Sequence, residues 1–102
     1  FLQFGLLGCQ AYLVGLASVY PEIAFDFYNA FLNKEYNRCD YIITNYEQPF
    51  FKVTKTIGWH IGLKSAMEHA GLMEKFERRP LVEVTFEQHE QVLNVLKKLG
   101  YK

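Results

Sequence analysis

The sequence predicts an α/β chain that is mostly helical and contributes one buried β-strand to a larger sheet. Apolar residues recur at helical spacing over most of the 102 residues. One short run, residues 11–14, is instead continuously apolar and lies between Gly8 and Gly15, which is typical of a strand buried on both faces. Because a single strand leaves its backbone donors and acceptors unpaired, we expect neighbouring strands that residues 1–102 do not supply.

The composition is that of one globular module without a charge bias. Hydrophobic residues make up 50% of the chain and charged residues 22%, as in ordinary soluble domains. Eleven lysine and arginine residues balance eleven aspartate and glutamate residues, so the basic surplus of proteins that bind nucleic acids or anionic membranes is missing. We therefore expect no nucleic-acid partner.

Residues 4–21 carry no charge, which leaves three alternatives: a membrane span, a signal peptide or a buried segment. A span needs about 20 apolar residues, but Gln10 and several glycines interrupt this one, and neither Lys nor Arg flanks it. A signal peptide would begin with a basic region, which is missing here. Burial inside a protein is the remaining interpretation, and we expect no membrane partner.

The cysteines also favour a cytoplasmic protein. Cys9 and Cys39 both lie on apolar segments. This placement is more typical of buried, reduced thiols than of a disulfide, and reduced thiols are the rule in the cytoplasm.

Four helical segments follow a short helical end in residues 1–8. Pro21 and Glu22 suit the first turn of a helix of about a dozen residues. An apolar stripe then predicts a long helix over residues 39–57, in which Pro49 should cause a kink. The stripe consists of Cys39, Ile43, Tyr46, Phe50, Val53 and Ile57.

The last two helices carry clear stop and start signals. Gly71 suits a left-handed cap after the helix that begins near Trp59. Thr85 and Gln88 have the spacing of a capping box at the start of the final helix, which Gly100 should end.

The order of "GCQAYLVGLASVYPE", "GLKSAMEHAGL" and "ERRPLVEVT" resembles the C-terminal third of the dihydrodipicolinate synthase and N-acetylneuraminate lyase family. Leu13 stands where the family has Ile, whereas Ala11, Val14 and Ser18 replace its usual Gly, Ser and Asn. The positions that match the family's motifs are Gly8, Gly15, Pro21, Glu22, Lys64, Gly71, Arg79, Pro80 and Leu81.

The resemblance implies the C-terminal portion of a (β/α)8 TIM barrel. Residues 1–34 would comprise the end of barrel helix 7, strand 8 and helix 8, and residues 35–102 a C-terminal helical extension in the same module. The chain viewed alone would be mostly α. Its partner would be the remainder of the barrel, and the family's association suggests a homo-oligomer, specifically a tetramer.

The resemblance also implies a Schiff-base-forming lyase, that is, an aldolase, synthase or dehydratase acting on pyruvate-like or sugar-derived 2-oxo acids. The family's catalytic lysine lies on an earlier strand, so this chain would hold no catalytic residue, require no cofactor or metal, and be inactive alone. Its residues nearest the chemistry would form a substrate-pocket wall at the C-terminal end of strand 8. The wall residues are Leu13, Val14, Gly15 and Ser18.

A stand-alone, non-catalytic helical interaction module is the alternative from another class. In that case residues 11–14 would continue a helix, and the aromatic residues would bind a partner.

For the remaining potentially reactive residues we expect ordinary structural roles. We expect Lys64 to form a surface ion pair with Glu68 at i+4 rather than to act as a nucleophile. His60, His69 and His89 lack the spacing of a metal site, and the last two are expected on helix surfaces.

Overall fold

Helices provide nearly all the regular structure in the computed structural model, which describes residues 1–100. The prediction of a mostly α chain is therefore confirmed, and residues 101 and 102 of the predicted 35–102 extension lie outside the described residues. The elements are α1 (Leu2–Leu6), α2 (Leu16–Val19), α3 (Pro21–Leu32), α4 (Tyr36–Ile42), the π-helical η1 (Ile43–Glu47), α5 (Gln48–Ile57), α6 (Trp59–His69) and α7 (Phe86–Lys98).

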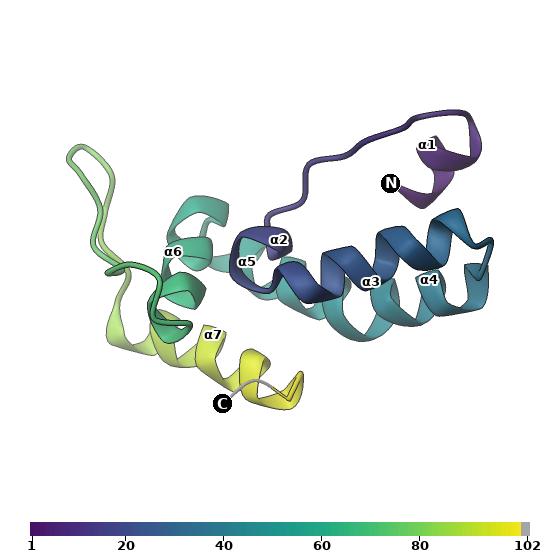
Figure 1. Cartoon of the computed structure of the whole chain (residues 1–102). Coiled ribbons are helices and arrows are strands. Elements are labelled where there is room, and N and C mark those ends of the chain that lie inside the picture. Colours follow the sequence, from purple (N-terminus) through teal and green to yellow (C-terminus); the bar gives the residue numbers. More distant parts are fainter. Residues whose placement is uncertain (101–102) are drawn as a thin grey trace.

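The helices form two adjoining groups (Figure 1). In one, α3 packs against α4; in the other, α5, α6 and α7 pack against one another, with α2 resting on both α3 and α6. The segment before α2 passes over α3, and a long connection between α6 and α7 projects from the body of the molecule (Figure 1). The N-terminal segment and this connection are thus the least covered parts of the fold.

Two clusters of buried side chains hold the helices together. The larger joins α2, α5, α6 and α7, and the smaller joins α3 to α4. Burial of these side chains is the main favourable contribution to folding. The larger cluster contains Leu16, Val19, Tyr20, Phe50, Ala66, Val92 and Leu96; the smaller contains Phe27, Ala30, Cys39 and Ile42.

Pro49, where we predicted a kink, lies in the first turn of α5 directly after a π-helical turn. Helical structure continues from Tyr36 to Ile57, and η1 occupies the five residues before α5 begins. Proline lacks the N–H group that would bond the carbonyl of Asn45, and a wider turn accommodates that loss. Ile42, just before the turn, is buried, while the predicted Ile43 is partly buried and packs against the same cluster.

Most helix ends follow the sequence signals. Gly71 has a φ of 75° and donates to the carbonyl of Glu68, while the next N–H, of Leu72, donates to Met67; this is the Schellman arrangement. The capping box is confirmed, because the Gln88 amide donates to Thr85 Oγ1 at 3.2 Å and the Thr85 amide to Gln88 Oε1 at 3.0 Å.

We expect Lys34→Gly to stabilise the protein by about 0.5–1 kcal/mol. Helix α3 ends in the same Schellman arrangement, but Lys34 occupies the left-handed position with a φ of 60°. Glycine removes the steric cost of that conformation, although it also makes the unfolded chain more flexible. Urea denaturation measures the change. Asn33→Gly, at a φ of −84°, is the control and should destabilise.

The predicted strand at residues 11–14 does not form within the described chain. No strand is present in residues 1–100, and this segment is an irregular connection between α1 and α2. The physical reason is that a strand is defined by hydrogen bonds to a second strand, and residues 1–100 offer none. The alternative in which the tetrapeptide continues a helix is also wrong.

The uncharged N-terminal stretch is divided between the five-residue α1, this connection and the four-residue α2. None of the helices described between residues 1 and 100 is both long enough and apolar enough to cross a bilayer. Both cysteines are free thiols; Cys39 is buried as predicted, but Cys9 is exposed because its segment has no cover.

Candidate functional site

Three of the four predicted wall residues lie together. Leu13, Val14 and Ser18 line an open groove of about 480 Å³, whose other side is formed by the first turns of α3. Gly15 adjoins the groove without lining it. The remaining lining residues are Tyr12, Ala17, Ala24 and Phe25.

Leu13 is the most unusual residue of this groove. Its relative exposure is 103%, so no described residue covers its side chain. In addition, neither its N–H nor its C=O makes a hydrogen bond within residues 1–100, and the same is true of the Tyr12 backbone. An apolar segment with an unpaired backbone has the properties of a sheet edge that can take a further strand.

Two tyrosines attach this segment to α3. The Tyr12 hydroxyl donates to the carbonyl of Ala24 at 3.4 Å, and the Tyr28 hydroxyl donates to Gln10 at 3.0 Å. The Tyr12 ring also stacks on Phe1, with 4.4 Å between centroids. Burial, with a smaller contribution from Glu47, raises the pKa of Tyr12 to about 12. Tyr12 therefore remains protonated at neutral pH and serves as an anchor.

Gly15 is required by a close contact with Trp59. A Cβ atom at Gly15 would overlap Cζ2 of the indole, so any other residue would displace the ring. The backbone at Gly15 has ordinary right-handed helical angles, which excludes a conformational reason for glycine. Nothing local in the sequence indicates this contact, because the two residues are far apart along the chain.

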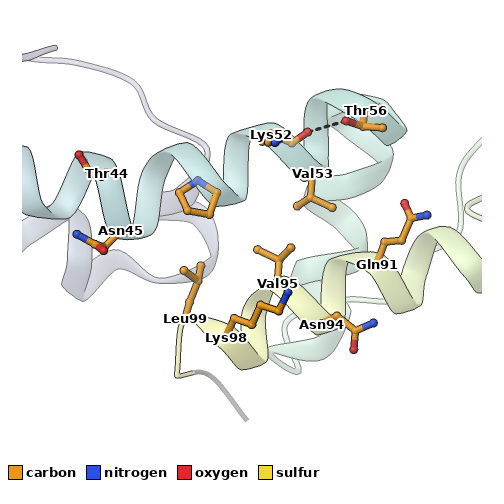
Figure 2. A pocket seen from close by; sticks show the side chains of 11 residues that line it. Thr44, Asn45, Lys52, Val53, Thr56, Gln91, Asn94, Val95, Lys98 and Leu99 are labelled. Atoms are coloured by element: carbon orange, nitrogen blue, oxygen red, sulfur yellow. Dashed lines mark hydrogen bonds between the residues drawn. The ribbon is translucent and has the colours of Figure 1, made fainter.

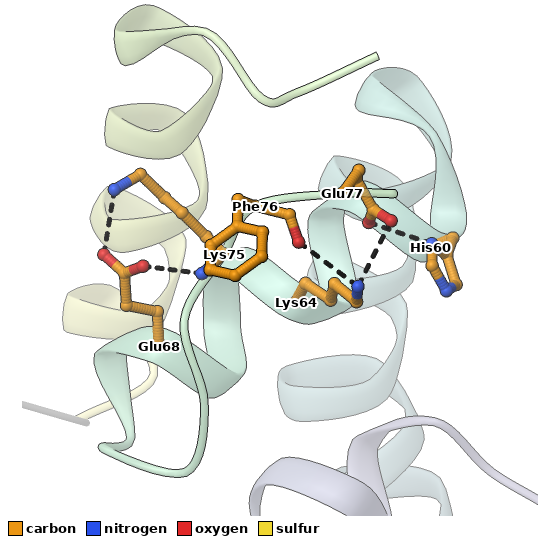
Figure 3. A network of polar contacts seen from close by, with 6 residues as sticks. All are labelled: His60, Lys64, Glu68, Lys75, Phe76 and Glu77. Carbon is orange, nitrogen blue, oxygen red and sulfur yellow. Dashed lines mark hydrogen bonds and ion pairs between the residues drawn. The ribbon is translucent and has the colours of Figure 1, made fainter. Parts of the chain in front are cut away.

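A second candidate region is a polar network between α6 and the connection that follows it (Figure 3). The Glu77 carboxylate, only 1% exposed, lies 3.2 Å from Lys64 Nζ and 2.9 Å from His60 Nδ1. Lys64 also donates to the carbonyl of Phe76 at 3.3 Å. These contacts hold the connection against α6.

The predicted pair between Lys64 and Glu68 is wrong. Glu68 instead accepts hydrogen bonds from the backbone and side chain of Lys75, at 2.7 and 2.9 Å, and these lower the pKa of Glu68 (Figure 3). The connection folds back over α6 and brings Lys75 and Glu77 close to it. Pairing between residues so far apart depends on that chain path, which helical spacing does not reveal.

His69 and His89 are also not the surface residues that we expected, since both are half-buried. His89 Nδ1 shares a hydrogen bond with the hydroxyl of Ser65, which has no solvent exposure. Burial, followed by the nearby Lys75 charge, lowers the pKa of His89. Because Ser65 is inaccessible to a substrate, this pair joins α6 to α7 and cannot serve as a nucleophile and its base.

We expect stability to fall as the pH drops through the range below about 6.5, the ordinary pKa of histidine. His89 has a lower pKa when folded, so the unfolded chain takes up a proton first and gains stability relative to the fold. Melting temperatures between pH 7.5 and 5.5 measure the effect. His89→Gln should make the melting temperature depend less steeply on pH. Above pH 7.5 its melting temperature should differ from that of the parent by a constant amount. An equally steep dependence in the variant would show that His89 is not the group responsible.

A metal site is not apparent in the described part of the chain, where no three His, Cys, Asp or Glu side chains converge. Comparisons with models of known families, with curated proteins and with solved structures find no match to this chain.

Proposed function

We propose that the chain is the C-terminal segment of a Schiff-base-forming lyase that acts on pyruvate-like or sugar-derived 2-oxo acids. In this proposal it closes a (β/α)8 barrel in the cytoplasm, supplies one wall of the substrate pocket and supports assembly of a homo-tetramer. The catalytic lysine comes from an earlier strand of the same barrel. Two observations support the proposal: the order of the family-like motifs along the sequence, and the lack of any strand partner for residues 11–14 within residues 1–100.

The observation that carries the proposal is the bare strand-length segment around Leu13. It combines a fully exposed leucine with backbone groups that no residue in 1–100 satisfies. In a parallel barrel, a strand buried on both faces is covered by side chains of the interior and by outer helices. Two flanking strands would supply the missing hydrogen bonds and remove Leu13 from water.

The groove beside this segment suits the proposed pocket wall. Leu13, Val14 and Ser18 line it, and they stand at the end of the proposed strand, where substrates bind in such barrels. The unpaired Leu13 carbonyl is available as an acceptor near a reactive lysine. The segment itself contributes shape and a backbone acceptor, and the carbon–carbon or carbon–oxygen chemistry belongs to residues outside it.

A chimaera tests the proposal directly. Residues 1–102 replace the C-terminal third of an active enzyme of the resembled family, and the product is incubated with pyruvate and borohydride. We expect a covalent pyruvate adduct on the host lysine, detected by mass spectrometry. Replacing that lysine with arginine should abolish the adduct. A soluble, folded chimaera without an adduct would contradict the proposal.

Variants at Leu13 provide a matched pair within the chimaera. Leu13→Ile restores the family's residue and should retain the adduct. Leu13→Asp places a charge in a strand covered on both faces and should prevent the barrel from closing, because burying an unpaired carboxylate is costly. Equal trapping by both variants would show that Leu13 remains exposed.

The stand-alone helical module remains the second candidate, and the larger buried cluster favours it. Phe50, Ala66 and Leu96 are at most 1% exposed without any partner chain. Circular dichroism and size-exclusion chromatography of the 102-residue chain distinguish the two functions. A compact, monodisperse helical species favours the module, whereas association through the exposed N-terminal segment favours the barrel.

A further inference from the structure

A second groove, remote in sequence from residues 11–18, lies between α7 and the helical rod formed by η1 and α5 (Figure 2). Its volume is about 630 Å³, which falls within the range of small-molecule pockets. Both walls belong to helices whose inner faces are packed in the larger buried cluster. The groove is therefore held open by the fold itself.

The floor of this groove is apolar. Pro49 and Val53 contribute from one helix, and Val95 and Leu99 from the other. All four side chains are half-buried, and Val53 and Leu99 rest directly on the buried cluster. An aliphatic chain lying on this floor would remove further apolar area from water, which favours binding.

The rim of the groove is positive. Lys52 on α5 and Lys98 on α7 both line it, and no Asp or Glu does. Neither lysine makes an ion pair with any residue described between 1 and 100. In Figure 2 the Lys98 side chain extends into the space between α7 and α5. An anionic group above the floor could approach both ammonium groups.

Uncharged donors accompany the lysines. Gln91 and Asn94 on α7 line the groove, and neither side chain is hydrogen-bonded within the described residues. By contrast, Asn45 already donates to the carbonyl of Tyr41 in α4, and Thr56 donates to that of Lys52 in α5. The α7 side of the groove thus has two unused amide groups on the same wall as Lys98.

We propose that this groove binds a small amphiphilic carboxylate, with its aliphatic chain on the floor and its carboxylate between Lys52 and Lys98. The two lysines disfavour a cation. A compact inorganic anion is also disfavoured, because it has no apolar group to bury on the floor. The volume of this open groove, about 630 Å³, is enough for one medium-length chain. This inference concerns α5 and α7 and holds whether or not the chain completes a barrel.

Equilibrium dialysis of monomeric decanoate against the 102-residue chain tests the proposal, because the method does not depend on the association state. We expect saturable binding at one site. Decyltrimethylammonium, with the same chain and opposite charge, should bind at least tenfold more weakly, and butyrate should not bind measurably. Raising the ionic strength should weaken decanoate binding, since salt screens exposed charge pairs.

Matched variants locate the site. The double variant K52Q/K98Q should weaken decanoate binding about tenfold, the combined effect of two exposed charge pairs. The control K55Q/K97Q changes net charge equally on the same two helices, outside the groove, and should stay within about twofold of the parent. V95F should block the floor and abolish binding while circular dichroism shows an unchanged helix content.

Several results would overturn the proposal. Equal binding of decanoate by K52Q/K98Q and K55Q/K97Q would place the ligand on other exposed apolar residues. Equal affinity for the cationic probe would exclude a role for the lysines. Binding to phosphatidylglycerol vesicles without binding of monomeric decanoate would assign the positive rim to a membrane surface.

Discussion

Phe50→Ala should lower the free energy of unfolding by about 3–5 kcal/mol, the usual cost of truncating a buried phenylalanine. The Phe50 side chain is 1% exposed and belongs to the cluster that joins α2, α5, α6 and α7. Its ring packs against Trp59 in a T-shaped arrangement, with 6.5 Å between the two ring centroids. Urea denaturation followed by circular dichroism measures the loss, and a variant too unstable to fold at 25 °C agrees with the prediction.

Phe51→Ala is the matched control, because Phe51 is the next residue on α5 but is 50% exposed. Its ring contacts Trp59 and lies beneath the Lys55 ammonium. Removing it should cost less than about 1.5 kcal/mol, the range for a partly exposed aromatic contact. Equal losses of unfolding free energy at the two positions would contradict the orientation of α5 that buries Phe50 and exposes Phe51.

Gly15→Ala should move the Trp59 indole and destabilise the fold by about 1–3 kcal/mol, the usual cost of forcing extra volume into a packed site. The added methyl group would overlap the ring, which must rotate away from α2 and from its contacts with Phe50 and Phe51. Trp59 is the only tryptophan in the chain, so the emission maximum of its fluorescence reports the movement directly.

Ser18→Ala provides the control for this experiment. Ser18 lies on α2 close to Gly15 but is exposed, so its substitution should change neither the emission maximum nor the stability by more than about 0.5 kcal/mol. An unchanged spectrum in Gly15→Ala would mean that the indole does not lie against residue 15. Gly15, which belongs to the candidate pocket wall, would then lack the contact with Trp59 that holds it in place.

Helix positions were largely predictable because their signals are local. Pro21 begins α3, the Thr85 and Gln88 pair begins α7, and Gly71 follows α6. Each signal acts within one helical turn, through a backbone hydrogen bond or a restricted φ, so it can be read without knowing the rest of the fold. Pro49 likewise marked the disturbance in the long helix, although the π-helical turn was not foreseen.

The candidate site was predictable only in part. Leu13, Val14 and Ser18 do share one groove, because residues so close in sequence cannot lie far apart. The contact of Gly15 with Trp59, the burial of Glu77 and the link between Ser65 and His89 were missed. Each of these joins segments separated by a turn or a long connection, and no periodic pattern within one segment encodes its partner.

The sequence by itself determined the helices, their caps and the apolar character of residues 11–14, because these properties depend on neighbouring residues and on side-chain chemistry. Only the tertiary structure decided which faces are buried, which charges meet and how the two grooves form, since those depend on the path of the connections. It also showed the segment around Leu13 to be uncovered, because β-pairing requires a second strand and residues 1–100 contain none.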